Sequence, residues 1–177
     1  VFAKIVGEKY PETFDPEVPK DLVYTGKYRL TDTVKGCPLT VGKLVLSPTR
    51  TYAPVVRAML QEHRGDIRGM IHCSGGGQTK ILHFIDKLHV VKDNLFETPL
   101  LFRIIQRESQ TPWREMYSVF NMGHRMELYV DSEAVADDLI RISKSFGVDA
   151  QVVGRVEAAD KASVTITHQN GTFDYYK

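Results

Sequence analysis

Apolar residues recur every three or four positions in several stretches of the chain, which is the spacing of a helix with one buried face. The last of these stretches has both ends marked, because Asp131 or Ser132 can cap its start and Gly147 can end it. Pro54 and Gly65 mark a second helix in the same way. The helices predicted from this spacing cover residues 1–10, 54–63, 78–84, 99–107 and 132–146, with a short one that begins at residue 112.

Strands are predicted where apolar and polar residues alternate, or where a short apolar run lies between turn residues. Met126, Leu128 and Val130 alternate with charged and aromatic residues, which indicates a half-buried strand. Asn170 and Gly171 are expected to form the tight turn between the last two strands. The predicted strands cover residues 67–73, 88–91, 122–130, 150–157, 164–168 and 173–176.

The order of these elements predicts an α+β fold, because the helices and strands interleave while the closing strands are expected to be antiparallel. Prolines and acidic residues interrupt the segment 11–19, and the segment 22–39 is polar and contains glycines, so both are predicted to be irregular. The main α/β body is therefore expected at residues 44–177, preceded by a helix and an irregular segment at residues 1–43.

A helical pattern begins directly at Val1, so we expect residues 1–177 to be a single domain of a longer protein. This length allows a substantial core without disulfides or metals. Cys37 and Cys73 are far apart in the sequence, which argues against a zinc site or a disulfide scaffold and favours a reduced, cytoplasmic setting. The sequence has no apolar run of about 18 residues and no secretion signal, so no membrane partner is expected.

The charges of the chain almost balance. It has 23 Lys and Arg residues against 22 Asp and Glu residues, a formal net charge of +1. A broad surface for nucleic acid or an anionic membrane is therefore not expected, although a local anion site is compatible with this charge. The six histidines fall at no metal-ligand spacing, so no metal site is predicted.

The strongest chemical signal is the sequence HCSGGGQTK at residues 72–80, between a predicted strand and a predicted helix. Three consecutive glycines cost conformational entropy, so the backbone there must bend sharply or approach another group closely. Unpaired amides at a helix start, with Ser74, Thr79 and Lys80, could bind a phosphate. The spacing matches neither the P-loop nor the dinucleotide-binding glycine motif. These residues leave two interpretations open, a phosphate site and a tight strand-to-helix turn.

Two further segments contain residues that could border a site. Thr49 and Arg50 precede the predicted helix 54–63, where helix capping and anion contacts both fit the sequence. Asn121 and Gly123 lie at the start of a predicted strand, where such residues commonly make a bulge or a turn. Alone, neither segment predicts a function.

No residue is assigned a catalytic role from its type and position alone. His72 is a weak candidate, because it lies beside the glycines and could contact an anion or act as an acid or base, but a histidine at a strand end is more often structural. Cys73 could act as a nucleophile at a helix start. A small buried thiol is the better interpretation.

Three motifs occur in a fixed order along the chain: LSPTRTY at residues 46–52, IHCSGGG at 71–77 and EMYSVFNMG at 115–123. Together they resemble the C-terminal half of the phosphoribosylformylglycinamidine cyclo-ligase family, also called the aminoimidazole ribonucleotide synthetases. The family usually has threonine where this chain has Ser74, which keeps the hydroxyl. It usually has glycine where this chain has Arg125, so a close backbone approach is not expected at that position.

The resemblance implies an enzyme that uses ATP and magnesium to convert formylglycinamidine ribonucleotide into aminoimidazole ribonucleotide in de novo purine biosynthesis. It also implies a three-layer α/β/α sandwich with a mixed sheet, partly ferredoxin-like, and a homodimer. In the family, ATP and magnesium are bound mainly by an N-terminal domain, which this chain lacks. The fragment is therefore expected to be inactive alone, to hold no cofactor tightly, and to have that domain and a phosphorylated small molecule as partners.

The same resemblance assigns residues to a substrate cleft. Those assigned to binding the substrate phosphate are Ser74, Gly75, Gly76, Gly77, Thr49 and Arg50, with Asn121 and Gly123 as further lining residues. Related two-domain enzymes are alternatives, namely formylglycinamidine ribonucleotide synthetase, thiamine-monophosphate kinase and selenophosphate synthetase. A non-catalytic module that binds a phosphorylated metabolite, and a glycine loop with only a structural role, are the remaining alternatives.

Overall fold

The computed structural model describes residues 12, 14–19, 27–47 and 50–177. The chain separates into two compact units, of which the first contains residues 1–49 and 107–110 and the second contains residues 50–106 and 111–177. The predicted helix at residues 1–10, part of the predicted irregular segment, and Thr49 lie outside the described residues. Most of the predicted elements belong to the second unit.

The described part of the first unit contains the short helix α2, Val41–Val45. Thr40 caps it, because its hydroxyl accepts a hydrogen bond from the Lys43 amide at 3.4 Å. The Gly42 amide donates to the Leu30 carbonyl, and a Cβ on Gly42 would lie only 2.9 Å from that oxygen. The sequence pattern does not predict α2, since five residues are too few to show an apolar repeat.

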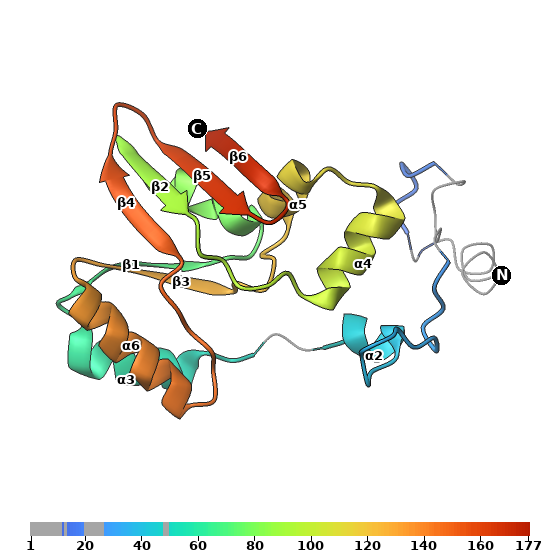
Figure 1. Ribbon diagram of the computed structural model, residues 1–177, viewed down its shortest axis with the longest axis horizontal. Helices are drawn as coiled ribbons and strands as arrows, with labels where there is room; N and C mark the ends of the chain where they lie inside the picture. Colours follow the sequence, from blue (N-terminus) through green and yellow to red (C-terminus); the bar gives the residue numbers. More distant parts are fainter. Residues whose placement is uncertain (1–11, 13, 20–26, 48–49) are drawn as a thin grey trace. The chain divides into compact units, whose positions relative to one another are not determined.

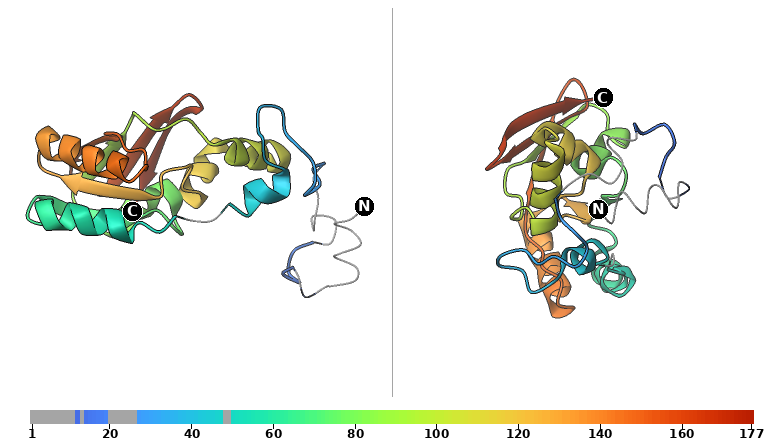
Figure 2. Two further views of the ribbon diagram at one scale, coloured as in Figure 1. Left: turned by 90° about the horizontal axis from the view of Figure 1, so that it is seen from below. Right: turned by 90° about the vertical axis from the view of Figure 1, so that its right-hand side faces the viewer.

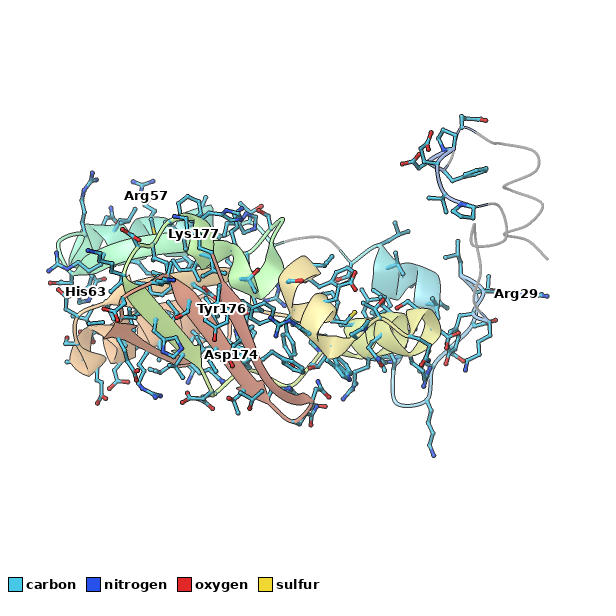
Figure 3. The ribbon with its side chains drawn as sticks, turned by 90° about the horizontal axis from the view of Figure 1, so that it is seen from above. Arg29, Arg57, His63, Asp174, Tyr176 and Lys177 are labelled. Carbon is cyan, nitrogen blue, oxygen red and sulfur yellow. The ribbon has the colours of Figure 1, made fainter. Side chains whose placement is uncertain are left out.

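In the second unit, two helices lie side by side on one face of a two-stranded antiparallel ribbon (Figures 1 and 2). The helices are α3, Ala53–His63, and α6, Glu133–Ser145, and the strands are β1, Ile67–His72, and β3, Met126–Val130. The buried residues of this core are Val55, Met59, Leu139 and Ile142. Arg57 projects from the opposite, exposed face of α3 (Figure 3). The periodic apolar residues of both helices thus form the face that covers the ribbon.

The ends of α6 follow the capping signals in the sequence. The Ser132 hydroxyl accepts a hydrogen bond from the Val135 amide at 3.3 Å, and Gly147 has a φ of +67° just beyond the helix. The prediction that Asp131 or Ser132 caps the start of this helix is confirmed for Ser132. The prediction that Gly147 ends it is confirmed as well, because glycine adopts a positive φ without steric cost.

The remaining four strands form a mixed sheet in the order β4-β2-β5-β6 (Figure 1). They are β2, Leu88–Lys92, β4, Gly154–Ala158, β5, Ser163–His168, and β6, Gly171–Tyr176. Strands β2 and β5 are parallel, and the other two pairs are antiparallel. The turn between β5 and β6 is Gln169-Asn170, one residue before the predicted Asn170-Gly171, because Gly171 already pairs with His168 as the first residue of β6.

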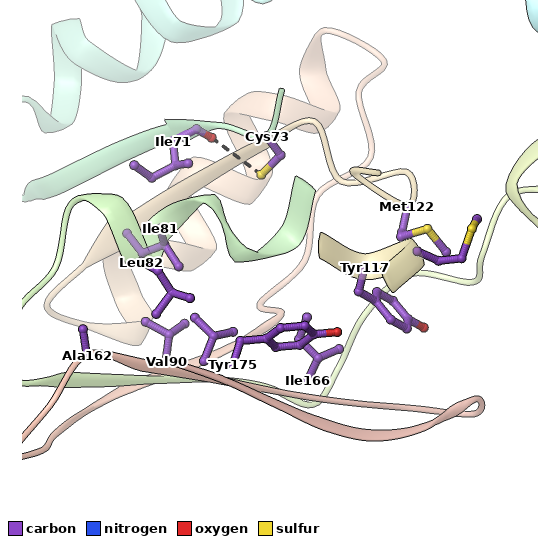
Figure 4. Packing of buried hydrophobic residues seen from close by; sticks show 12 residues of the cluster. Ile71, Cys73, Ile81, Leu82, Val90, Tyr117, Met122, Ala162, Ile166 and Tyr175 are labelled. Atoms are coloured by element: carbon purple, nitrogen blue, oxygen red, sulfur yellow. Dashed lines mark hydrogen bonds between the residues drawn. The ribbon is translucent and has the colours of Figure 1, made fainter. Parts of the chain in front are cut away.

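A second core fills the space between the ribbon and the mixed sheet (Figure 4). Helix α5, Trp113–Val119, and the 3₁₀ helix η2, Gly77–His83, contribute to it, and Phe102 and Ile105 of helix α4, Leu100–Ser109, pack against it. Its buried residues are Ile71, Cys73, Ile81, Leu82, Val90, Met116, Tyr117, Met122, Ala162, Val164, Ile166 and Tyr175. The core therefore draws on segments from both halves of the sequence.

The α+β class is confirmed, and the larger sheet is mixed as expected. Other local predictions are wrong as well. The helix after the glycines is a 3₁₀ helix, residues 122–125 do not belong to β3, and β4 begins at Gly154 instead of residue 150. Met122 and Gly123 have φ values of 52° and 99°, outside the β region, and these residues form a turn before β3.

None of the helices in the described ranges is long and apolar enough to cross a membrane.

Candidate functional site

The glycine loop, defined here as residues 74–77, joins β1 to η2. Gly76 and Gly77 have φ values of 91° and 50°, in the left-handed region that glycine enters without steric cost. The Gly77 amide donates to the Ser74 carbonyl at 2.9 Å, which closes the turn. Ser74 and Gly75 are exposed, so one side of the loop faces solvent.

Gly77 packs against the end of α5. A Cβ at Gly77 would lie 2.4 Å from the Phe120 carbonyl oxygen and 2.8 Å from the Tyr117 carbonyl oxygen. No side chain fits at these distances. Packing therefore requires glycine at position 77, whereas a Cβ at Gly75 would meet nothing within 4 Å, and the predicted role of the glycines in binding phosphate stays a prediction.

The exposed side of the loop gathers groups that can bind an anion. Within the part of the chain that the structure describes, the amides of Gly75 and Gly76 donate no hydrogen bond to the protein. The Lys80 ammonium donates to the Ser74 hydroxyl, so a cation and a hydroxyl lie beside these amides. Consecutive free amides in a turn form a concave anion site. The contribution of a helix dipole is small, since η2 is a 3₁₀ helix of only seven residues.

The turn at residues 121–124 lies against the start of η2. The Gln78 side-chain amide donates to the Asn121 carbonyl, and the Asn121 Oδ1 accepts from the Gly123 amide at 2.9 Å. Gly123 is fixed by a second contact, because a Cβ there would lie 2.9 Å from Cγ of Pro99. The structure thus brings Asn121 and Gly123 next to the glycine loop.

Arg50 lies at the end of α6. Its guanidinium donates to the Gly147 carbonyl at 3.3 Å, and its side chain is exposed. This contact satisfies a carbonyl group just beyond the helix. In the described residues, no hydrogen bond joins Arg50 to the glycine loop. Its predicted role in binding phosphate, like that of Thr49, stays a prediction.

The two reactive side chains before the glycines lie in different surroundings. His72 is exposed, and its carbonyl accepts from the Ser74 amide at 2.8 Å. Cys73 is 1% exposed, and burial together with the negative charge of Glu127 raises the pKa of its thiol to about 12. Figure 4 shows this thiol directed toward the Ile71 carbonyl. The thiol therefore stays protonated, and the interpretation of Cys73 as a buried structural residue is correct.

A buried polar network next to the loop is missed by the sequence reasoning. It consists of Gln78, Lys92, Glu127 and Tyr129, with hydrogen bonds that join η2, β2 and β3. The alternation in β3 predicts that Glu127 faces solvent, but it is only 6% exposed. Both faces of the ribbon are covered, so alternation does not separate buried from exposed residues there. The one signal in the sequence is Lys92, a charged residue at the end of a short apolar strand.

His124 is buried beside this network, at 5% exposure. Its Nε2 accepts a hydrogen bond from the Phe96 amide at 2.9 Å, and its ring lies edge-on to that of Phe96 with 5.0 Å between centroids. Burial lowers the pKa of His124 to about 4, although the Glu127 carboxylate opposes the shift. The ring is therefore neutral near pH 7, with its proton on Nδ1.

This burial predicts a pH-dependent stability. Since the pKa of His124 is lowered on folding, its contribution is fully present above about pH 6.5 and is lost as the pH falls toward about 4. We expect His124 to account for roughly 3 kcal/mol of the fall in unfolding free energy across this range. Urea denaturation of the wild type and of His124→Gln, which keeps an acceptor for the Phe96 amide, measures the difference. Parallel pH profiles for the two proteins would contradict the prediction.

The described residues contain no group of three or more His, Cys, Asp or Glu side chains that could hold a metal ion.

The fold and the loop define an α+β domain in which a glycine turn and an asparagine turn meet beside an exposed surface. The chain belongs to the family described as AIR synthase related protein, C-terminal domain, whose model matches residues 29–167. This match confirms the resemblance found in the three sequence motifs.

Several curated relatives of the chain are named as cyclo-ligases. It is 37% identical over 117 residues to the phosphoribosylformylglycinamidine cyclo-ligase of Methanocaldococcus jannaschii, covering 66% of this chain and 33% of that protein. The protein of the same name from Carboxydothermus hydrogenoformans is 34% identical over 144 residues, 80% of this chain and 41% of that protein. The protein of the same name from Syntrophus aciditrophicus is 32% identical over 161 residues, which cover 85% of this chain and 44% of that protein. The chain thus spans less than half the length of these relatives.

Proposed function

We propose that this chain is the C-terminal, substrate-binding domain of an ATP-dependent cyclo-ligase that converts formylglycinamidine ribonucleotide into aminoimidazole ribonucleotide in purine biosynthesis. The shared name of the relatives supports this reaction over those of thiamine-monophosphate kinase and selenophosphate synthetase. The observation that carries the role of the domain is the exposed group formed by the amides of Gly75 and Gly76, the Ser74 hydroxyl and the Lys80 ammonium.

In this proposal the glycine loop binds the phosphate of the ribonucleotide. That phosphate does not react, because ring closure joins the amidine and the activated formyl group at the other end of the molecule. Binding a remote phosphate fixes the position of the reacting end and lowers the entropic cost of reaching the transition state. The glycine loop is thus a positioning element, and the reacting groups meet other residues.

ATP and magnesium are proposed to bind mainly outside this chain, on an N-terminal domain of the same enzyme. ATP supplies the activation of the formyl oxygen. We therefore propose that the chain alone is inactive, and that the full-length enzyme is a homodimer.

An amide NMR titration of the chain tests the role of the loop. Inorganic phosphate and aminoimidazole ribonucleotide are expected to give saturable shifts at residues 72–80, with the ribonucleotide binding more tightly because it has more contacts. ATP with magnesium should shift these residues no more than free phosphate does. If neither phosphate nor the ribonucleotide shifts the loop, its proposed role is wrong.

Lys80→Met is expected to weaken phosphate binding about five- to tenfold, since it removes one charge-assisted hydrogen bond donor from the site. Lys161→Met is the matched control, because Lys161 is an exposed lysine in the turn before β5. The dissociation constants come from the same NMR titration. Equal losses in the two variants would mean that Lys80 acts only through the overall charge of the chain.

A further inference from the structure

Lys92 on β2 is a buried lysine with an unusual number of partners. It is 1% exposed. Its ammonium donates to the Gln78 backbone carbonyl at 2.7 Å, to the Gln78 side-chain oxygen at 3.3 Å, and to the Glu127 carboxylate. An ammonium group has three N–H donors, so all of them are used inside the protein.

The partners of Lys92 extend the network to the asparagine turn. The Gln78 side-chain amide donates to the Asn121 carbonyl and, at 3.5 Å, to the His124 carbonyl. The second carboxylate oxygen of Glu127 accepts from the Tyr129 hydroxyl at 2.8 Å. In the described residues, no buried side-chain nitrogen or oxygen atom lacks a hydrogen bond partner. The network is therefore complete, which is the condition under which buried polar groups make a structure rigid.

Stability alone does not explain a buried ion pair at this place. The transfer of two charges out of water costs several kcal/mol per ion, and well-packed apolar residues of similar volume stabilise a core equally well or better. What an apolar pair cannot do is hold both oxygens of Gln78 in fixed positions. Gln78 is fully buried and follows Gly77 directly, so its position determines where the glycine loop ends.

The glycine loop needs such a restraint from outside. Its glycines have the greatest backbone freedom of any residue, so the loop alone does not hold its amides in one orientation. Lys92 holds Gln78 from one side, and Asn121 accepts from it on the other. The network thus connects the loop to β2, to β3 and to the asparagine turn.

We propose that the Lys92–Glu127 ion pair is a positioning device for the glycine loop, which holds Gln78 so that the loop amides and the Asn121 turn keep the geometry that binds phosphate. Neither charged residue contacts the ligand. The identity of the ligand rests on the proposed function of the loop, whereas the restraint on the loop does not.

The test is a double variant, Lys92→Met with Glu127→Gln. It leaves no buried charge, approximately preserves both side-chain volumes, and keeps a polar partner for the Tyr129 hydroxyl, so the fold is expected to persist. The variant loses the ion pair and, with it, the two hydrogen bonds from Lys92 to Gln78. The matched control is Arg155→Met with Glu157→Gln, which removes the same two charges from an exposed pair on β4, whose Nε and Oε1 atoms are 2.6 Å apart.

Two measurements separate positioning from stability. Amide hydrogen exchange at the hydrogen-bonded amides of Ser74, Gly77, Thr79 and His124 is expected to become about tenfold faster in the double variant, while β5 and β6 keep the wild-type rate. The dissociation constant for inorganic phosphate, from the NMR titration, is expected to rise about tenfold. The control pair should change both quantities less than about twofold.

The outcomes distinguish this inference from the proposed function. If the wild type shows no phosphate binding, the proposed function of the loop fails, and the exchange rates still decide the positioning role. If the glycine loop of the double variant exchanges its amide hydrogens no faster than the loop of the control variant, the inference is overturned, even if phosphate binds. Should the double variant not fold, Tyr129→Phe removes one restraint on Glu127 at lower cost, and loop exchange about two- to fivefold faster is then expected. A loop exchange rate equal to that of the wild type in Tyr129→Phe also overturns the inference.

Discussion

Gly77→Ala is expected to lower the free energy of unfolding by about 4–5 kcal/mol, because it combines steric overlap with backbone strain. The new Cβ would lie 2.4 Å from the Phe120 carbonyl oxygen, and the neighbouring Tyr117 oxygen is 2.8 Å away. Both are backbone atoms of the α5 end and cannot move as a flexible side chain could. The φ of 50° adds a cost of about 1 kcal/mol for a residue with a side chain. Urea denaturation measures the loss.

Gly75→Ala is the matched control in the same loop. Its Cβ would meet nothing within 4 Å, and its φ lies outside the left-handed region. We expect a change of less than about 0.5 kcal/mol. Similar losses for the two variants would mean that the loop needs flexibility throughout, and not a close approach at Gly77.

Lys92→Met as a single variant is expected to cost about 3–5 kcal/mol of unfolding free energy, because it leaves the Glu127 carboxylate buried without a countercharge. Both side chains are almost fully buried, at 1% and 6% exposure for the two residues. The measurement is urea denaturation near pH 7, and an unchanged m-value would show that the folded and unfolded states keep their compactness.

The double variant, Lys92→Met with Glu127→Gln, is expected to recover most of that loss, since no buried charge remains. If the double variant recovers its stability while its glycine loop exchanges amide hydrogens faster, the ion pair positions the loop and does not merely stabilise the fold. A double variant as unstable as the single one would show that the cost comes from the lost contacts of Lys92, and not from the unpaired carboxylate.

Much of the candidate site can be predicted from the sequence, because its parts are local. The glycine loop follows an apolar strand directly, and the motif at residues 115–123 ends in the turn that lies beside it. The network around Lys92 could not be predicted, since Gln78 and Glu127 are 14 and 35 positions away from it. A sequence separation of this size carries no information about contact. The burial of Glu127 was predicted wrongly, because alternation marks the buried face of a strand only when its other face meets solvent.

The sequence by itself determined the elements with strong local causes. The helices α3 and α6 follow from apolar spacing with capping residues, the β5–β6 hairpin follows from Asn170 and Gly171, and the family follows from three ordered motifs. Only the tertiary structure decided which of the three glycines is constrained by packing, and which charged residues are buried as a pair. Those properties depend on contacts between residues that are far apart in the sequence. The end of α5 lies against Gly77, and Glu127 of β3 contacts Lys92 of β2. No local sequence pattern predicts such contacts.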